Sequence, residues 1–204
     1  MKTRRPFGIY VRHGAASVVV AFLVIAIGTP ITTFAADAAK LWTTVGSAGT
    51  VDANDLNIFT TSDRNISVMA PQLPATLDVR YNIVAVDGLV PANNSGQSIF
   101  MKVRYRDLGS NGQIVLRLKR YNLTTGTTTT LLTFDSNGFP QSNAAQVRSV
   151  STEPCISVVK FDFVNNAYFV DAQLIQTSFV NIADLPPLVG IIQVGASDVS
   201  CPPS

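Results

Sequence analysis

Apolar and polar residues alternate along three stretches of the chain, residues 75–86, 98–106 and 113–121. In the first stretch, for example, Leu77 and Val79 are separated by a single aspartate. Because successive side chains of a β-strand point to opposite faces, a period of two places apolar side chains on one face and polar ones on the other. Each stretch therefore predicts a half-buried strand of an antiparallel sheet.

Turn-forming residues separate these strands. The glycine-containing segment 108–112 predicts a turn between the second and third strands, and 124–126 predicts another turn after the third. A last strand is predicted over 188–194, whereas 62–72 and 178–187 are less regular. About seven to nine strands and almost no helical periodicity predict an all-β fold, a single antiparallel two-sheet β-sandwich of jelly-roll or immunoglobulin-like topology.

A further hairpin is predicted around Asn165 and Asn166. With these two residues as the turn, Lys160 lies opposite Asp171 and the polar side chains share one face. A shift of one residue would bury the charges, so only this register separates the two kinds of side chain. The opposite face would carry Phe161, Phe163, Tyr168, Val170, Ala172 and Leu174.

The first 35 residues have the pattern of an export signal. A basic segment precedes a charge-free run from Gly14 to Ala36. Small residues at the end of this run and just after it allow cleavage after Ala35, which we expect, or after Ala38. An uncleaved membrane anchor is the alternative, because the uncharged run reaches the roughly 20 residues that span a bilayer core. We therefore expect a signal peptide over 1–35 and a single β-sandwich domain over 36–204, placed in the periplasm, at the cell surface or outside the cell.

The segment Thr3-Arg4-Arg5-Pro6-Phe7 resembles the twin-arginine export motif, in which an arginine pair is followed by a phenylalanine one residue later. Gly8 departs from the apolar residue expected next, and the apolar run suits the general secretory route equally well. The resemblance implies a bacterial protein that is exported already folded.

Removal of the signal changes the charge and the chemistry of the protein. The chain has 15 Lys and Arg residues against 13 Asp and Glu; four of the cations and none of the acids lie in 1–35, which leaves 11 against 13. The only histidine, His13, is also removed. The remaining domain has no histidine for a catalytic triad or a zinc site, and its charge does not favour nucleic acid as a partner.

Cys155 and Cys201 are the two cysteines of the chain. An even number of cysteines in an oxidising compartment predicts a disulfide. The bond would close a loop worth on the order of 4 kcal/mol by the chain-entropy estimate and would tie the proline-rich C-terminal tail to the sheet.

A cationic face is the candidate binding site. If the strands that flank 107–112 form a hairpin with Arg106 opposite Gln113, cations and aromatic rings alternate on one face and could hold an acidic polysaccharide. The alternative is a solvated face that acids of a neighbouring strand neutralise. The face would comprise Phe100, Lys102, Arg104, Arg106, Arg117, Lys119 and Tyr121.

Other chemistries have weaker support in the sequence. Asp162 and Asp171 are the best carboxylate pair for an aspartate-dependent polysaccharide-active enzyme, but an ion pair with Lys160 explains Asp171 simply. The oxygen-rich segment 52–57 is typical of a turn and has a leucine where a calcium loop often has glycine. We predict no metal and no cofactor.

These observations predict a secreted, non-enzymatic β-sandwich that binds an extracellular surface, a glycan or a matrix component. Its partner would be a polysaccharide or a cell-surface polymer, and contact with a membrane would require an uncleaved signal. A self-associating subunit of an envelope or appendage and the aspartate-dependent enzyme are the alternatives. The pattern does not fix the oligomeric state.

Overall fold

The structure is a computed structural model that describes residues 41–69, 74–86, 89, 97–107, 109, 111–152, 161–178 and 185–198. The predicted signal peptide over 1–35 and the predicted disulfide between Cys155 and Cys201 lie outside these residues. No helix within them is long and apolar enough to cross a membrane.

The described residues form eleven strands and three short 3-10 helices, so the all-β prediction is confirmed. The strands are β1 (Trp42–Val45), β2 (Thr50–Val51), β3 (Phe59–Ser62), β4 (Asn65–Val68), β5 (Ala75–Ile83), β6 (Gln97–Asp107), β7 (Gly112–Asn122), β8 (Thr128–Asp135), β9 (Ser142–Ser151), β10 (Asn166–Gln176) and β11 (Leu188–Asp198). The helices are η1 (Gly46–Ala48), η2 (Ala53–Asp55) and η3 (Ser136–Gly138).

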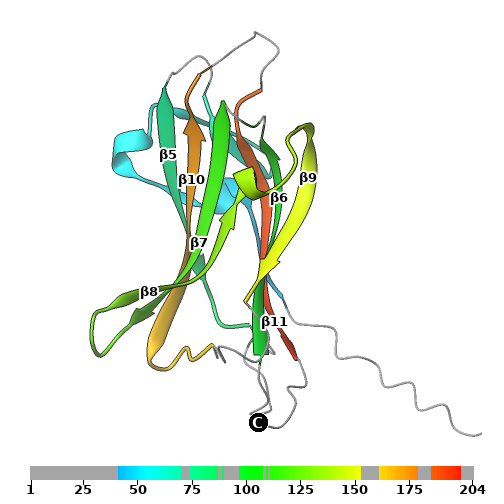
Figure 1. Ribbon diagram of the computed structural model, residues 1–204. Helices are drawn as coiled ribbons and strands as arrows, with labels where there is room; N and C mark the ends of the chain where they lie inside the picture. The colour runs from blue at the N-terminus through cyan, green and yellow to red at the C-terminus, as the bar shows by residue number, and fades with distance from the viewer. Residues whose placement is uncertain are drawn as a thin grey trace, which may run out of the picture. The chain divides into compact units, whose positions relative to one another are not determined.

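The strands make two antiparallel sheets that pack against each other (Figure 1). Sheet A has the order β3-β4-β11-β6-β9, with β1 also paired to β11, and sheet B has the order β2-β5-β10-β7-β8. The three strands predicted from alternation are β5, β6 and β7, the predicted last strand is β11, and the second strand of the hairpin predicted around Asn165 and Asn166 is β10. The prediction of seven to nine strands was too low, because β1 to β4 are short and β9 is mostly polar.

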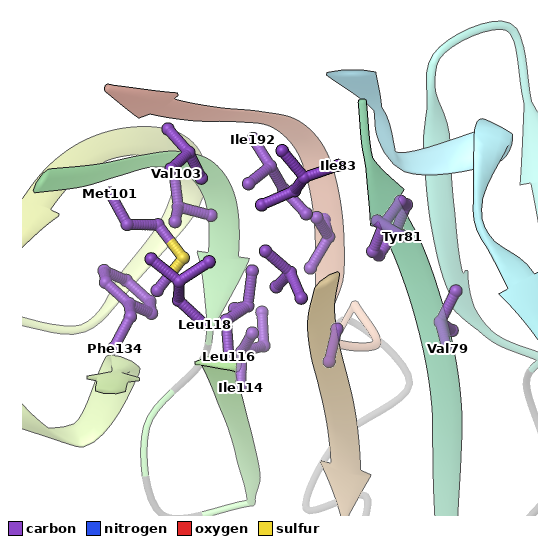
Figure 2. Packing of buried hydrophobic residues seen from close by; sticks show 14 of the residues in the cluster. Val79, Tyr81, Ile83, Met101, Val103, Ile114, Leu116, Leu118, Phe134 and Ile192 are labelled. Carbon is purple, nitrogen blue, oxygen red and sulfur yellow. The ribbon is translucent and has the colours of Figure 1, made fainter. Parts of the chain in front are cut away.

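One core lies between the sheets and is built from the inward positions of the alternating strands (Figure 2). On β7, for instance, Ile114, Leu116 and Leu118 are fully buried. Burial of such a side chain contributes about 1.5–3 kcal/mol. Sheet A supplies Met101, Val103 and Ile192 to the same cluster, and sheet B supplies Val79, Tyr81, Ile83 and Phe134.

The 3-10 helix η1 fits closely against sheet A. A Cβ atom on Gly46 would overlap the backbone carbonyl oxygen of Val189 in β11. The hydroxyl group of Tyr81, which is buried, donates a hydrogen bond of 2.8 Å to the carbonyl oxygen of Gly46. The absence of a side chain at Gly46 therefore lets the chain pass directly over the edge of the core.

The predicted hairpin between β6 and β7 is not formed, which corrects the expected pairing of Arg106 with Gln113. Strand β6 pairs with β11 and β9 in sheet A, whereas β7 pairs with β10 and β8 in sheet B. The intervening segment crosses from one sheet to the other, and Gly109 adopts a φ of 82° within it. A link of four residues can span about 13 Å, more than the roughly 10 Å between stacked sheets.

The hairpin predicted around Asn165 and Asn166 is also wrong in its pairing. Strand β10 has β5 on one side and β7 on the other, so that Arg80 and Arg117, not Lys160, lie opposite Asp171. No side of β10 is left for another partner there. A turn does precede β10, but it spans residues 163–165, and Asn166 is already the first residue of the strand. The carboxylate of Asp162 accepts hydrogen bonds from the N–H groups of Val164 and Asn165 in this turn. The predicted aromatic grouping of Phe161, Phe163 and Tyr168 is present, with ring centroids 4.9–5.9 Å apart.

Candidate functional site: a polar groove on sheet B

The outer face of sheet B carries a groove of about 530 Å³. The floor is formed by outward side chains of three neighbouring strands, β5, β10 and β7, and the wall by β2 and η2. The alternation that buries Leu116 and Leu118 of β7 turns Arg117 and Lys119 to the opposite face of the sheet, where they line the groove. The other polar floor residues are Asp78, Arg80, Asn82, Asp171 and Gln173.

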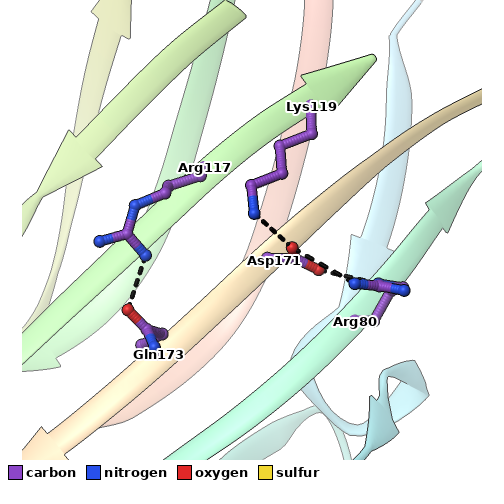
Figure 3. Close-up of polar contacts among 5 residues, drawn as sticks. All are labelled: Arg80, Arg117, Lys119, Asp171 and Gln173. Carbon is purple, nitrogen blue, oxygen red and sulfur yellow. Dashed lines mark hydrogen bonds and ion pairs between the residues drawn. The ribbon is translucent and has the colours of Figure 1, made fainter. Parts of the chain in front are cut away.

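Asp171 is the centre of an ion-pair network on the groove floor (Figure 3). One carboxylate oxygen lies 2.8 Å from Nε of Arg80, and the other lies 2.8 Å from Nζ of Lys119. Burial by itself would raise the pKa of Asp171, but the hydrogen bonds from Arg80 and Lys119 hold the pKa below its ordinary value. The carboxylate is therefore ionised at neutral pH and neutralises much of the charge of its two partners.

Phe169 supports this network from one side. The guanidinium carbon of Arg80 lies 4.5 Å from the centre of the Phe169 ring, which is a cation–π distance. Phe169 is only partly exposed. The ring therefore orients Arg80 toward Asp171 and is not a free apolar patch.

Arg117 is the groove cation without a carboxylate partner. Its Nη1 donates a hydrogen bond of 2.6 Å to Oε1 of Gln173, and no described carboxylate forms an ion pair with it. The acid opposite Arg117 in the sheet is Asp171, which binds Arg80 and Lys119 instead. The remaining N–H groups of Arg117 can therefore donate to a ligand in the groove.

Hydrogen bonds of Asp52 and Asp55, in the segment 52–57, hold the wall of the groove against β5. The N–H of Asp78 donates to Oδ2 of Asp55 at 2.8 Å, and the N–H of Asp52 donates to the carbonyl oxygen of Asp78 at 3.0 Å. Oδ1 of Asp52 accepts the N–H of Asn54 at 3.0 Å. This segment is a capped 3-10 turn, and no group of three or more His, Cys, Asp or Glu side chains suited to a metal occurs in the part of the chain that the structure describes.

The residues of the predicted cationic face are divided between two sheets. Arg117 and Lys119 line the groove, and Tyr121 lies farther along β7, where its hydroxyl oxygen approaches Gly126 of the next turn. The β6 residues of the prediction, Phe100, Lys102, Arg104 and Arg106, belong to sheet A. The prediction that all seven residues share one face was therefore wrong. Alternation identifies the inner side of a strand but not the sheet to which the strand belongs.

Arg106 has a structural contact of its own. Its Nη2 donates to the carbonyl oxygen of Pro186 at 3.1 Å, and burial lowers the pKa of the guanidinium. Nε of Arg106 is buried without a hydrogen-bond partner among the described residues. Arg106 is thus less available to a ligand than Lys102 and Arg104, which are exposed.

The carboxylate pair proposed for an enzyme is not assembled by a hairpin. Asp162 caps the turn before β10, where it bonds to Val164 and Asn165, whereas Asp171 bonds to Arg80 and Lys119. Each carboxylate has separate partners, and the pKa of each is lower than its ordinary value. Neither environment favours the protonated carboxyl that a general acid needs at neutral pH.

Sequence reasoning missed the contribution of β5 to the site. Asp78, Arg80 and Asn82 were recognised only as the polar side of an alternating strand. They reach Arg117 and Lys119 because β10, far along the chain, lies between β5 and β7. The alternation of apolar and polar residues predicted that these side chains point outward. The local sequence did not predict which strands lie beside β5.

Comparisons with known proteins do not identify a family. No protein-family model matches the chain, and no curated protein matches it. Among solved structures, the chain is similar to one titled "Structure of infectious bursal disease virus Gt strain", with 12% sequence identity and a TM-score of 0.32. The match covers 79% of this chain and 32% of the viral chain, so this chain spans about a third of that length. A TM-score this low gives no basis for transferring a fold or a function.

Proposed function

We propose that the protein is an exported, non-enzymatic β-sandwich that binds a glycan in the groove of sheet B. The observation that carries the proposal is the volume of the groove, about 530 Å³, together with its polar floor. This volume lies within the roughly 300–1,000 Å³ of ligand sites. Placement outside the cell rests on the sequence of residues 1–35.

The side chains of the groove favour a ligand rich in hydroxyl groups. Most drug-like sites are enclosed and apolar, whereas this floor presents amides, carboxylates and guanidinium groups. Arg117 and Asn82 offer donors, and Asp78 offers acceptors. A saccharide satisfies both kinds of group at once, since each hydroxyl donates and accepts.

The charge of the floor favours an uncharged saccharide. Asp78 and Asp171 oppose Arg80, Arg117 and Lys119 on the floor, and Asp52 adds an acid at the wall. Three acids therefore balance three cations. A neutral ligand would keep the Asp171 network intact, whereas a strong anion would compete with Asp171 for its partners.

Calorimetric titration of the purified protein with a panel of neutral oligosaccharides tests the proposal. Asn82 is exposed on β5, so a tryptophan there can point outward and fill the groove without entering the core. We expect Asn82→Trp to weaken binding at least tenfold, about 1.4 kcal/mol. Arg117→Gln, which keeps a donor but removes the charge, should weaken binding less.

Asn143→Trp is the matched control, because Asn143 is exposed on β9 of the other sheet. Thermal unfolding of each variant would show that the fold is retained. Equal affinity in the wild type and in Asn82→Trp would reject the groove as the site. Absence of binding across the panel would reject the glycan function.

We further infer that the topology is a jelly roll. Strands β4 to β11 supply two sets of four, β4-β11-β6-β9 and β5-β10-β7-β8, in which only β7 and β8 are neighbours both in sequence and in the sheet. A jelly roll combines eight strands in two sheets. Immunoglobulin sheets instead pair successive strands such as A with B, which makes that alternative less suitable. The fold alone does not select a function.

Self-association is a second candidate that the edges of the sheets favour. Strands β8 and β9 each have one paired neighbour. Neither contains a lysine or a proline, and the single cation in the two strands is Arg148 of β9. Natural edge strands usually carry lysine or proline against edge-to-edge pairing. Sedimentation at increasing concentration would reveal association, and Ser149→Lys should then abolish it; a constant monomer would reject this candidate.

A further inference from the structure

The outer face of sheet A carries a line of cations on β6. Lys102 and Arg104 are exposed and two residues apart, so their side chains leave the same face about 7 Å from each other. Phe100 precedes them on that face and is partly exposed. We call Lys102 and Arg104 the β6 cation pair.

No described acid is paired in the sheet with either residue of the β6 cation pair. Lys102 is opposite Ser149 of β9 and Gln193 of β11, and Arg104 is opposite Val147 and Ile191. Neither cation forms an ion pair with a described residue. The groove of sheet B is different, since there Asp171 binds two cations at 2.8 Å. Among the described residues, the charges of Lys102 and Arg104 are therefore not neutralised by an ion pair, unlike those of Arg80 and Lys119.

Glycines on β11 shape the surface next to the cations. A Cβ atom on Gly190 would lie 3.7 Å from Cγ of Arg104, and one on Gly195 would overlap the ring of Phe100. Both glycines are buried beneath neighbouring side chains, Gly190 beside Asn65 and Arg104, and Gly195 beside Leu41 and Phe100. In the sheet, the neighbours of Lys102 are the hydroxyl-bearing Ser149 and the amide-bearing Gln193.

We propose that this face binds a linear acidic polysaccharide, with its carboxylate or sulfate groups on Lys102 and Arg104 and its hydroxyls on Ser149 and Gln193. Charge complementarity selects a polyanion. Hydroxyl and amide neighbours suit a sugar chain better than a phosphate backbone. Two cations neutralise too few phosphates for strong nucleic-acid binding and give too little attraction, about 1 kcal/mol each, for a lipid surface.

This proposal does not rest on the glycan function of the groove, which is on the other sheet. The two sites take chemically different ligands, one anionic and one neutral. Loss of one binding activity in a variant should leave the other unchanged, so that each proposal can fail separately.

Affinity electrophoresis of the purified protein in gels containing polygalacturonate tests the inference, with dextran sulfate and neutral dextran in parallel gels. We expect retardation by both polyanions at low salt, none by dextran, and release as the ionic strength approaches 0.5 M. Lys102→Ala with Arg104→Ala should weaken polygalacturonate binding at least tenfold. Arg64→Ala, which removes an exposed cation from the turn between β3 and β4, is the control and should bind like the wild type.

Four results would overturn the inference. The first is unchanged retardation in the double variant, and the second is equal retardation by neutral dextran. The third is tighter binding of single-stranded DNA or of vesicles of phosphatidylserine than of either polysaccharide. A protein that no polyanion retards at low salt would equally reject it, and unfolding curves would show whether the double variant is folded.

Discussion

Replacement of Asp171 by asparagine tests the balance of charge on sheet B. Asparagine keeps the size of the side chain and one oxygen but removes the charge that holds Arg80 and Lys119 at 2.8 Å. It would also leave three cations, Arg80, Lys119 and Arg117, on neighbouring strands without an ion-paired acid between them. We therefore expect Asp171→Asn to destabilise the fold.

The exposure of the partners sets the magnitude. Exposed ion pairs contribute about 0.2–1 kcal/mol each. The Lys119 pair is partly shielded, with side chains 26% and 22% exposed, so it belongs near the upper end of that range. The Arg80 side chain is 56% exposed, so solvent screening places its pair near the lower end. The sum is about 1 kcal/mol, which lowers the melting temperature by about 2–4 °C in a domain of this size.

The stability difference between the wild type and Asp171→Asn should depend on pH, which distinguishes the loss of an ion pair from other effects of the substitution. The pKa of Asp171 is below that of an unfolded aspartate, so its stabilisation is present above about pH 4 and is lost as the pH falls through the folded-state pKa. Thermal unfolding of the wild type and of Asp171→Asn should differ at pH 7 and converge as the pH falls below the folded-state pKa of Asp171. Added salt should also narrow the difference at pH 7. Equal stability at pH 7, or a difference that persists in acid, would refute the reasoning.

Three other substitutions test the core, the close packing of η1 and a buried acid. Leu116→Ala should lower the free energy of unfolding in urea by about 2–5 kcal/mol, because Leu116 is fully buried. A loss below about 1 kcal/mol would mean that neighbouring side chains fill the space or that Leu116 is not part of the core. Gly46→Ala should lower it by about 1–3 kcal/mol through overlap with Val189, and an unchanged denaturation midpoint would contradict that contact. Burial raises the pKa of Asp107, so wild-type stability should fall as the pH rises from the unfolded value near 4 through the folded-state pKa. In Asp107→Asn, melting curves from pH 4 to 7 should not show this fall, and parallel pH profiles of the two proteins would be evidence against it.

The sequence predicted the long central strands well because their alternation reflects burial directly. Strands β5, β6, β7 and β11 each place a row of aliphatic side chains in the core. Strand β9 has only one neighbour and a mostly polar sequence, so its ten residues carry little alternation of hydrophobicity. Strands β1 to β4 have two to four residues each, too few for a period to be recognised.

Partnership between strands could not be predicted, because side-chain periodicity is the same for every possible neighbour. The short link between β6 and β7 suggested a hairpin, yet the chain changes sheets there. Arg117 and Lys119 were chosen correctly as outward cations, and both line the groove. Their contacts with Gln173 and Asp171 depend on β10, whose position between β5 and β7 is a property of the whole fold.

The central place of β11 in sheet A has a consequence for the order of folding. This last described strand pairs with β1, β4 and β6, and Val189 meets Ile66 from near the start of the domain. Sheet A therefore lacks an interior strand until Leu188–Asp198 is available, and both β4 and β6 keep an open edge until then. Such a high contact order slows folding. The native fold can therefore be completed only after nearly the entire domain has been synthesised. Until then β4 and β6 each remain without their partner strand β11.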